Sequence, residues 1–324
     1  YSDGSRVPII YDGSDAYPMG IANPSSAPSV AGMGSGDWSG DWSFAITWTM
    51  WEVGAESGRS AEDSITLTSD TPTVTRPSPP SDATGWRVWA RDDSDPNGLF
   101  YLLTPTPIPV ATSDWTAPAG DPDTLLLQET SFTPSTVAPD LENVAFFNGV
   151  YFGSIGDELY WSAPLGPGTW PGENYTRLPF EGNDRVMGMA ALQDSLVIFG
   201  RRNILVVSGY YPAFTITRVD AAIGLVGEDA FQEIEGQVAF LSDEGVRIYP
   251  GLGVIGEGIQ RTLGLKSIPQ KEAAILRHSP RENALWLAID GYTYVLFLRG
   301  GGVSRYDFNP TAILSGGRTG LDPN

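Results

Sequence analysis

The chain has 324 residues, of which 41% are hydrophobic, and its 38 glycines and 26 prolines are typical of a folded, turn-rich β protein. Its 19 Lys and Arg residues against 39 Asp and Glu residues give a net charge of −20, which argues against tight binding of nucleic acid because phosphate contacts need a basic surface. The lack of cysteine excludes disulfides, thiolate zinc sites and cysteine nucleophiles, and no run has the length of a membrane span or the pattern of a signal peptide.

The first 22 residues contain a short apolar run, at residues 7–13, that ends in an Asp-Gly turn. This run resembles the endings of repeat units found later in the chain, such as residues 247–251. Residues 1–22 are therefore predicted to supply one or more strands to the repeat domain, with a simple extended arm as the alternative. Residues 23–37 are rich in Pro, Ser, Ala and Gly without periodicity, and they are predicted to form a linker.

Residues 37–130 contain short β-forming runs separated by turn residues. The run at 43–53 alternates apolar and polar side chains, which predicts a strand with one buried face. Further runs lie at residues 64–68, 73–75, 85–91, 99–103 and 108–112. Five or six short strands at this spacing predict a β-sandwich of roughly 90 residues.

Tryptophans cluster in the same region, at Trp38, Trp42, Trp48, Trp51, Trp86, Trp89 and Trp115. We interpret them as residues of a sandwich core or of a subunit interface, where tryptophan is used heavily. An aromatic row that stacks on sugars is the alternative.

One stretch of this region fits the first half of a calcium loop. Asp93, Asp95 and Asn97 alternate so that their oxygens would converge on one ion. The twelfth position of such a loop needs a bidentate Glu, and here it is Thr104. Asp, Pro, Asn and Gly are also the residues of a hairpin loop, so we predict a loop without metal, and calcium binding stays open as the alternative.

Residues 135–324 repeat. Four units each contain short apolar runs separated by Gly, Asn, Asp or Ser turns, and their first turns centre on Asn148, Asp194, Glu235 and Arg281, in steps of 46, 41 and 46 residues. The second turns centre on Asp157, Arg202, Glu244 and Gly291. A period in the forties with several strands per unit predicts the blades of a β-propeller, which fold only against one another.

No catalytic constellation is predicted. His278 is the only histidine, it is placed in a polar turn, and no Gly-x-Ser-x-Gly motif accompanies it. Residues 242–245 faintly resemble the Asp-box turn of sialidases but are more typical of a tight turn. Among 39 acids no pair stands out for glycoside hydrolysis. We therefore predict a protein that is not an enzyme and has no catalytic residue, cofactor or metal ion.

The two halves together resemble a known family. Residues 48–60 and 85–91 are similar to strands of a fibronectin type III module. Residues 146–152, 159–164, 196–200, 204–209, 224–227, 238–249 and 302–307 resemble propeller segments of the tail nozzle (tail tubular) proteins of short-tailed bacteriophages. The resemblance implies an all-β protein with a β-propeller at residues 1–22 and 135–324 and a fibronectin-like insert at 37–130.

The resemblance also implies a function. Such a subunit is a structural protein of the virion tail, assembles as a homohexameric ring, contacts other tail and adaptor proteins, and surrounds the channel through which genomic DNA is retained and ejected without specific binding. A receptor- or carbohydrate-binding tail protein is the first alternative. A propeller glycosidase, with carboxylates in its central funnel, is the second.

Overall fold

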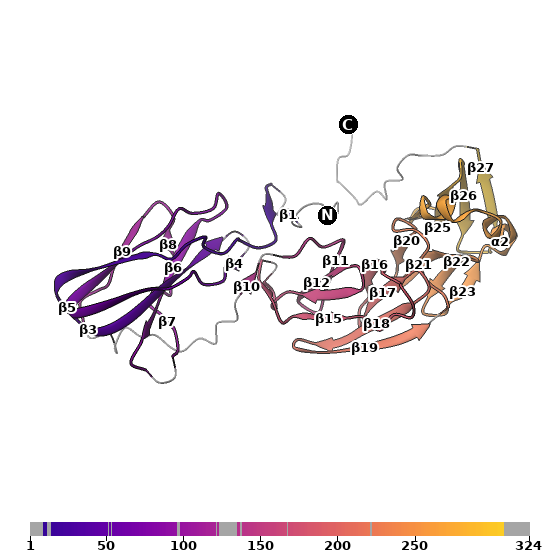
Figure 1. The fold of residues 1–324 in the computed structure, drawn as a ribbon. Coiled ribbons are helices and arrows are strands. Elements are labelled where there is room, and N and C mark those ends of the chain that lie inside the picture. Colours follow the sequence, from indigo (N-terminus) through magenta and orange to yellow (C-terminus); the bar gives the residue numbers. More distant parts are fainter. Residues whose placement is uncertain are drawn as a thin grey trace, which may run out of the picture. The chain divides into compact units, whose positions relative to one another are not determined.

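A computed structural model of the chain divides it into two compact units. The first contains residues 1–142, 149–152 and 160–175, and the second contains residues 143–148, 153–159 and 176–324. The structure describes residues 9–11, 14–50, 52, 54–95, 98–120, 122, 135–136, 138–166, 168–220 and 222–307. The regular secondary structure of the described part is almost entirely β, as the sequence predicted, with antiparallel strands in both units (Figure 1).

The N-terminal segment forms a small hairpin. Strand β1 (Ile9–Tyr11) pairs antiparallel with β2 (Ala16–Pro18), from Ile9 against Pro18 to Tyr11 against Ala16. Among the described residues, β1 and β2 pair with each other only. A strand supplied by residues 1–22 to the repeat units therefore stays a prediction.

A seven-stranded sheet dominates the first unit. Its order is β7-β6-β3-β5-β9, with β4 also paired to β3 and β8 to β6. The strands are β3 (Ser29–Met50), β4 (Ala55–Glu56), β5 (Asp63–Thr75), β6 (Gly85–Asp92), β7 (Tyr101–Leu102), β8 (Ile108–Pro109) and β9 (Asp114–Thr116). Strands β3, β5, β6, β7 and β8 overlap the runs predicted within 37–130, and two of those runs form the single strand β5, whereas β4 and β9 were not predicted.

Two details of this sheet correct the sequence analysis. The predicted linker is partly strand, because residues 29–34 of β3 pair with β5 from Ser29 against Thr75 to Gly34 against Asp70. This strand was not predicted because its residues are small and show no periodicity, and its stability comes from backbone pairing with β5. The run at 43–53 is also not half buried, because residues 42–50 of β3 are buried on both faces.

The two faces of β3 have different cores. Phe44, Ile46 and Trp48 belong to one large apolar cluster, whereas Ala45 packs with Trp89 in a smaller one. Two polar residues on the second face are hydrogen-bonded: Ser43 Oγ donates to Asp93 Oδ2 at 2.8 Å, and Thr47 Oγ1 donates to Glu56 Oε1 at 2.7 Å. The buried hydroxyl of Thr49, on the same face, has no partner in the described part of the chain. These hydrogen bonds explain why Ser43 and Thr47 can be buried.

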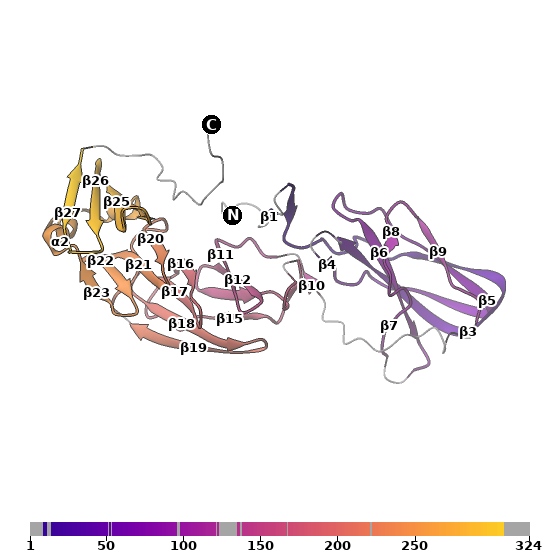
Figure 2. The ribbon, with the colours of Figure 1, turned by 180° about the vertical axis from the view of Figure 1, so that it is seen from behind.

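The repeat half contains four consecutive four-stranded sheets, which we call meanders 1 to 4 (Figures 1 and 2). Meander 1 consists of β11 (Asn143–Phe147), β12 (Val150–Ile155), β13 (Glu158–Trp161) and β15 (Tyr175–Arg177). A short pair, β10 (Ser135–Thr136) with β14 (Trp170–Pro171), lies outside the meanders. Meander 2 consists of β16 (Val186–Ala191), β17 (Leu196–Gly200), β18 (Ile204–Tyr210) and β19 (Ala213–Asp220).

Meander 3 consists of β20 (Phe231–Ile234), β21 (Gln237–Ser242), β22 (Gly245–Tyr249) and β23 (Gly253–Ile255). Meander 4 consists of β24 (Ile275–Ser279), β25 (Ala284–Ile289), β26 (Tyr292–Phe297) and β27 (Val303–Tyr306). All eight predicted turns fall between strands, at Asn148, Asp194, Glu235 and Arg281 and at Asp157, Arg202, Glu244 and Gly291. The turn prediction is thus confirmed. The fourth strand of each meander was not predicted.

Successive meanders contact each other through their first strands, β11 to β16, β16 to β20 and β20 to β24. One apolar core runs through meanders 2, 3 and 4. Phe199 of meander 2 lies with its ring centroid 4.9 Å from that of Phe240 of meander 3. The faces of these sheets are therefore buried against one another, as repeat units require.

Two short helices, α2 (Glu257–Gly264) and α3 (Ile268–Glu272), connect meanders 3 and 4. Ile259 and Leu263, four residues apart on α2, are buried. Helix α3 begins with a capping box between Ser267 and Gln270. No helix in the described ranges is long and apolar enough to cross a bilayer.

Candidate functional site

A charged hollow of about 860 Å³ lies in the second unit, where turns of meanders 2 and 3 adjoin helix α3. The loops before β16 and β20, the β17–β18 and β21–β22 turns, and α3 each place charged side chains in its wall. These side chains are Asp184, Arg185, Arg201, Arg202, Glu228, Asp229, Asp243, Lys271 and Glu272. We call this feature the charged hollow.

Arg201 connects three parts of its wall. Its Nη1 donates to the carbonyl oxygen of Val226 at 2.8 Å and lies 3.4 Å from Glu272 Oε1, and its Nη2 lies 3.2 Å from Asp243 Oδ1. The planar guanidinium supplies several donors in fixed directions, which suits a residue that bridges separate segments. Arg201 therefore holds meander 2 against meander 3 and α3.

Asp184 fixes the turn that carries Arg201. Its Oδ1 accepts the backbone N–H of Arg201 at 2.7 Å, and its Oδ2 accepts the N–H of Arg202 at 3.0 Å and the side-chain amide of Asn203 at 2.5 Å. Gly200 leaves room for this carboxylate, because a Cβ there would stand 2.6 Å from Asp184 Oδ2. One carboxylate thus organises the whole β17–β18 turn.

Lys271 is one of only two lysines in the chain, and it is buried. Its Nζ donates to the carbonyl oxygen of Asp243 at 2.6 Å and lies 3.9 Å from Asp243 Oδ1. Arg185 pairs with Glu228 at 3.0 Å on the outer wall. Acidic and basic groups are therefore matched within the hollow, and their contacts join secondary-structure elements to one another.

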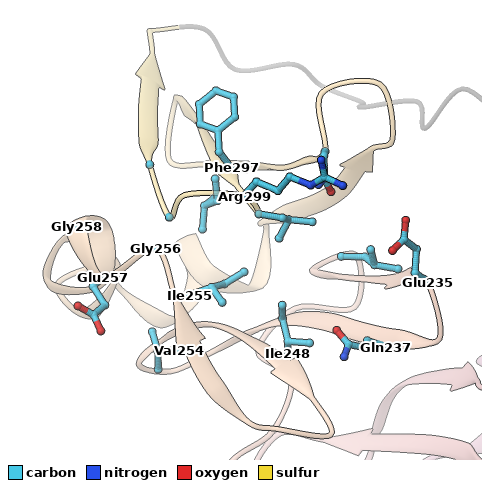
Figure 3. Close-up of a pocket in the computed structure, with 16 residues that line it drawn as sticks. Glu235, Gln237, Ile248, Val254, Ile255, Gly256, Glu257, Gly258, Phe297 and Arg299 are labelled. Atoms are coloured by element: carbon cyan, nitrogen blue, oxygen red, sulfur yellow. The ribbon is translucent and has the colours of Figure 1, made fainter.

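A second concavity, the inter-meander groove, lies between meanders 3 and 4 and has a volume of about 730 Å³ (Figure 3). Ile248, Val254, Ile255, Leu296 and Leu298 give it an apolar floor. Figure 3 shows Ile248 and Ile255 between the segment that carries Phe297 and Arg299 and the strand that carries Gln237.

The rim of the groove is polar. It carries the exposed side chains of Glu235, Glu257 and Arg299, for which the described part of the chain offers no hydrogen bond or ion pair. Gly258, in the first turn of α2, also lines the groove, and a Cβ at this position would meet no atom within 4 Å. The groove is accessible, apolar at its base and able to form hydrogen bonds at its edge.

The candidate calcium ligands are only partly described. Asp93 Oδ1 pairs with Arg91 Nε at 3.0 Å, while its Oδ2 accepts the hydroxyl of Ser43. Asp95 follows a turn that begins at Asp92, and Asn97 lies outside the described residues. Within the described ranges no group of three or more His, Asp or Glu side chains is placed to hold a metal ion.

His278 is not in a turn, contrary to the sequence analysis. It lies in β24 opposite Leu285, and the turn begins two residues later, at Pro280. Its Nε2 is buried without a hydrogen-bond partner in the described part of the chain. Residues 242–245 form a tight turn, which the sequence analysis favoured over an Asp box. Ser242 Oγ donates across this turn to the carbonyl oxygen of Gly245 at 2.8 Å.

The tryptophans are mostly core residues. Trp38, Trp42, Trp48, Trp86 and Trp89 are buried, and Trp115 is half buried. Trp51 lies outside the described residues. The interpretation as core is confirmed for the five buried residues, which are inaccessible to a sugar ring.

Sequence reading missed one ionic site in the first unit. Glu56 Oε2 pairs with Arg87 Nη1 at 2.9 Å, and its Oε1 accepts the Thr47 hydroxyl. Burial raises the pKa of Glu56 above its ordinary value of 4.5, while the Thr47 hydrogen bond and the Arg87 charge act in the opposite direction. The only sequence signal was an acid three residues after a β-forming run, a position that many exposed acids share.

No protein-family model matches the sequence, and no curated protein matches it. Among solved structures, the extracellular domain of a proposed one-component system of B. thetaiotaomicron is 11% identical over 69% of this chain and 26% of its own, with a TM-score of 0.35. A proposed 6-phosphogluconolactonase of Bacteroides uniformis is 10% identical over 85% of this chain and 84% of its own, with a TM-score of 0.38. PorZ, a surface component of the type-IX secretion system of Porphyromonas gingivalis, is 13% identical over 75% of this chain and 32% of its own, with a TM-score of 0.26. The chain thus spans about a quarter of the length of the first of these proteins.

Proposed function

We propose that this chain is a structural subunit of a bacteriophage virion, a tail nozzle or tail tube component whose copies form a ring around the DNA channel. The observation that carries the proposal is the series of four consecutive four-stranded sheets, joined through their first strands, in a chain that also holds a separate tryptophan-rich sheet. In this proposal the four meanders are propeller-like blades. The sequence resemblance to tail nozzle proteins supports the same assignment.

The tryptophan-rich sheet is, in the proposal, a fibronectin III-like module. The register of β3 against β5 shifts between Gly34 and Ser39, and Ser35 has a φ of 77°. A bulge of this kind bends a long strand, so its two ends can serve different layers. The module would add contact surface without interrupting a blade.

The acidic composition supports a channel protein. A net charge of −20 gives a surface that repels phosphates, and at physiological salt this repulsion acts within roughly 8 Å. A channel lined by such a surface would let the genome pass without holding it. Neighbouring tail and adaptor proteins would bind the two ends of the ring.

Electron microscopy of the purified chain tests the proposal. We expect negatively stained particles to be closed rings of one size, six subunits around, with a central hole. The comparison sample is the same protein at a concentration low enough to dissociate the ring. Fields of single, unassociated subunits at every concentration would overturn the proposal.

A further inference from the structure

Among the described residues of the second unit, the most exposed aromatic side chain lies at the tip of the β18–β19 hairpin. Tyr210 is 74% exposed, and Tyr211 and Pro212 beside it are exposed as well. Strand pairing continues to the end of the hairpin, where Tyr210 faces Ala213, and the carbonyl oxygen of Gly209 accepts a hydrogen bond from the Asn148 amide at 2.9 Å. The tyrosines therefore project from a fixed support.

The same hairpin is uncharged over a long stretch. Residues 204–217 contain no Asp, Glu, Lys or Arg, in a chain whose net charge is −20. Strand β19 is an outer edge of meander 2, with no strand beyond it among the described residues. Edge strands are normally protected by charges, because an uncharged free edge invites association with another chain. This edge has its first charge only at Arg218.

We propose that the tyrosine tip of one copy docks in the inter-meander groove of a second copy. This inference rests on the proposed ring and names the contact that closes it. Tyrosine combines a large apolar ring with a polar hydroxyl, so its ring suits the floor at Ile248, Val254 and Ile255, and its hydroxyl suits the unpaired rim groups Glu235 and Arg299.

Charge favours this pairing over other contacts between two copies. Two strongly acidic chains repel each other over most of their surfaces, but an uncharged tip meets no such repulsion at a groove whose charged rim groups are Glu235, Glu257 and Arg299. Tip and groove are different surfaces of one subunit. The contact is therefore head-to-tail and repeats from copy to copy until the ring closes.

The tip would be the energetic centre of a larger interface. Two tyrosines bury about 150–250 Å² each, whereas a stable interface needs at least about 1,200 Å² in total. The exposed side of β19 flanks the tip and would supply further area. Truncating a central aromatic anchor usually weakens such an interface strongly, so we expect the concentration needed for assembly to rise at least about tenfold.

Gly258→Trp tests the groove side. A side chain can be introduced at this lining position without backbone strain, because a Cβ at Gly258 meets nothing within 4 Å, and an indole there is expected to obstruct the groove. Gly264→Trp is the matched control, since Gly264 lies in the same helix, is equally free of neighbours and does not line the groove. Sedimentation velocity should show assembly weakened in G258W and unchanged in G264W.

The tip side is tested by Tyr210→Ser combined with Tyr211→Ser, with Leu265→Ser as control because Leu265 is 80% exposed elsewhere on the unit. Circular dichroism confirms that each variant is folded. If the wild type forms rings and G258W and the double serine variant form them equally well, the docking proposal is wrong and the ring remains. If the wild type itself stays monomeric, the proposed function has failed.

Crosslinking gives a direct readout, because the chain has no cysteine of its own. Tyr211→Cys chains are mixed with Gly258→Cys chains and oxidised. A disulfide between the two variants, absent when either is oxidised alone, is the expected result. Failure to crosslink under conditions where the mixture assembles would contradict the contact.

Discussion

At the scale of single residues, Asp184 carries the most contacts in the charged hollow. It accepts hydrogen bonds from two backbone N–H groups and one side-chain amide of the β17–β18 turn. Hydrogen bonds to a charged acceptor are stronger than neutral ones, and loss of the acceptor leaves several donors unpaired. The β17–β18 turn also positions Arg201, which connects meander 2 to meander 3.

Asp184→Ala should therefore lower the free energy of unfolding by about 1–3 kcal/mol. Asp194→Ala is the control, because Asp194 lies exposed in the first turn of the same meander without a hydrogen bond among the described residues. Urea unfolding at neutral pH measures both. Equal stability of D184A and D194A would show that the carboxylate does not organise the turn.

Glu56 gives a prediction about pH. Its folded-state pKa is raised, chiefly by burial, so the folded state binds the proton more tightly than the unfolded state does. Its contribution to stability is full below the unfolded pKa and is lost as pH rises through the raised folded pKa. We therefore expect the unfolding free energy of the wild type, relative to that of Glu56→Gln, to fall as pH rises above 4.5.

The measurement is urea unfolding of both chains at several pH values. Subtracting the two curves removes the contributions of Asp114 and Asp290, whose pKa values are lowered by hydrogen bonds from Thr75 and Lys266 and whose effects have the opposite sign. A difference that stays constant with pH would mean that Glu56 titrates as it does in the unfolded chain.

At the scale of elements, close backbone approach joins the loop before β20 to the β17–β18 turn. The N–H of Leu225 donates to the carbonyl oxygen of Gly200 at 2.9 Å. A Cβ at Gly224 would stand 2.3 Å from that oxygen and 2.5 Å from the carbonyl carbon of Arg201. Because these are backbone atoms, neither side can move away cheaply.

Gly224→Ala should accordingly destabilise the protein by about 1–3 kcal/mol through overpacking. Gly264→Ala, on the open surface of α2, should be neutral or slightly stabilising, since alanine favours helix. Thermal unfolding of the two variants provides the comparison. A Gly224→Ala protein as stable as the wild type would show that the two segments are not held together.

Elements were predictable where local chemistry decides them. Turn residues with fixed conformational preferences marked the positions between strands, and Asn148 and Glu235 indeed have φ values of 49° and 48°. Three of the four fourth strands could not be read in this way, because β15, β23 and β27 are three or four residues long and depend on a neighbour for pairing. Strand β19 has eight residues and was missed as well. Helices α2 and α3 were missed since eight and five residues give little periodic signal.

The candidate sites were much less predictable than the elements. Asp184, Arg201, Asp243 and Glu272 come from four segments, and only the packing of meanders brings them together. The same holds for the inter-meander groove, whose floor combines β22, β23 and β26. A single sequence gives the residue types at these positions but not their proximity. His278 shows the converse error, because a polar neighbourhood suggested a turn where pairing with Leu285 makes a strand.

At the scale of the whole molecule, the proposed function requires assembly into a ring. A subunit of stacked sheets with an uncharged projecting hairpin and a matching groove has the parts of a head-to-tail interface, and the proposed role in a virion tail requires that such contacts close. A high negative charge makes this association sensitive to salt, because screening lowers the repulsion between copies.

The mass of the purified protein in solution shows whether the subunits form a closed ring. Native mass spectrometry, supported by sedimentation velocity at low and at physiological salt, should show one dominant species of six times 34.8 kDa that becomes more populated as salt is raised. A protein that remains a 34.8 kDa monomer at micromolar concentration under both conditions would contradict the assignment as a ring-forming tail protein.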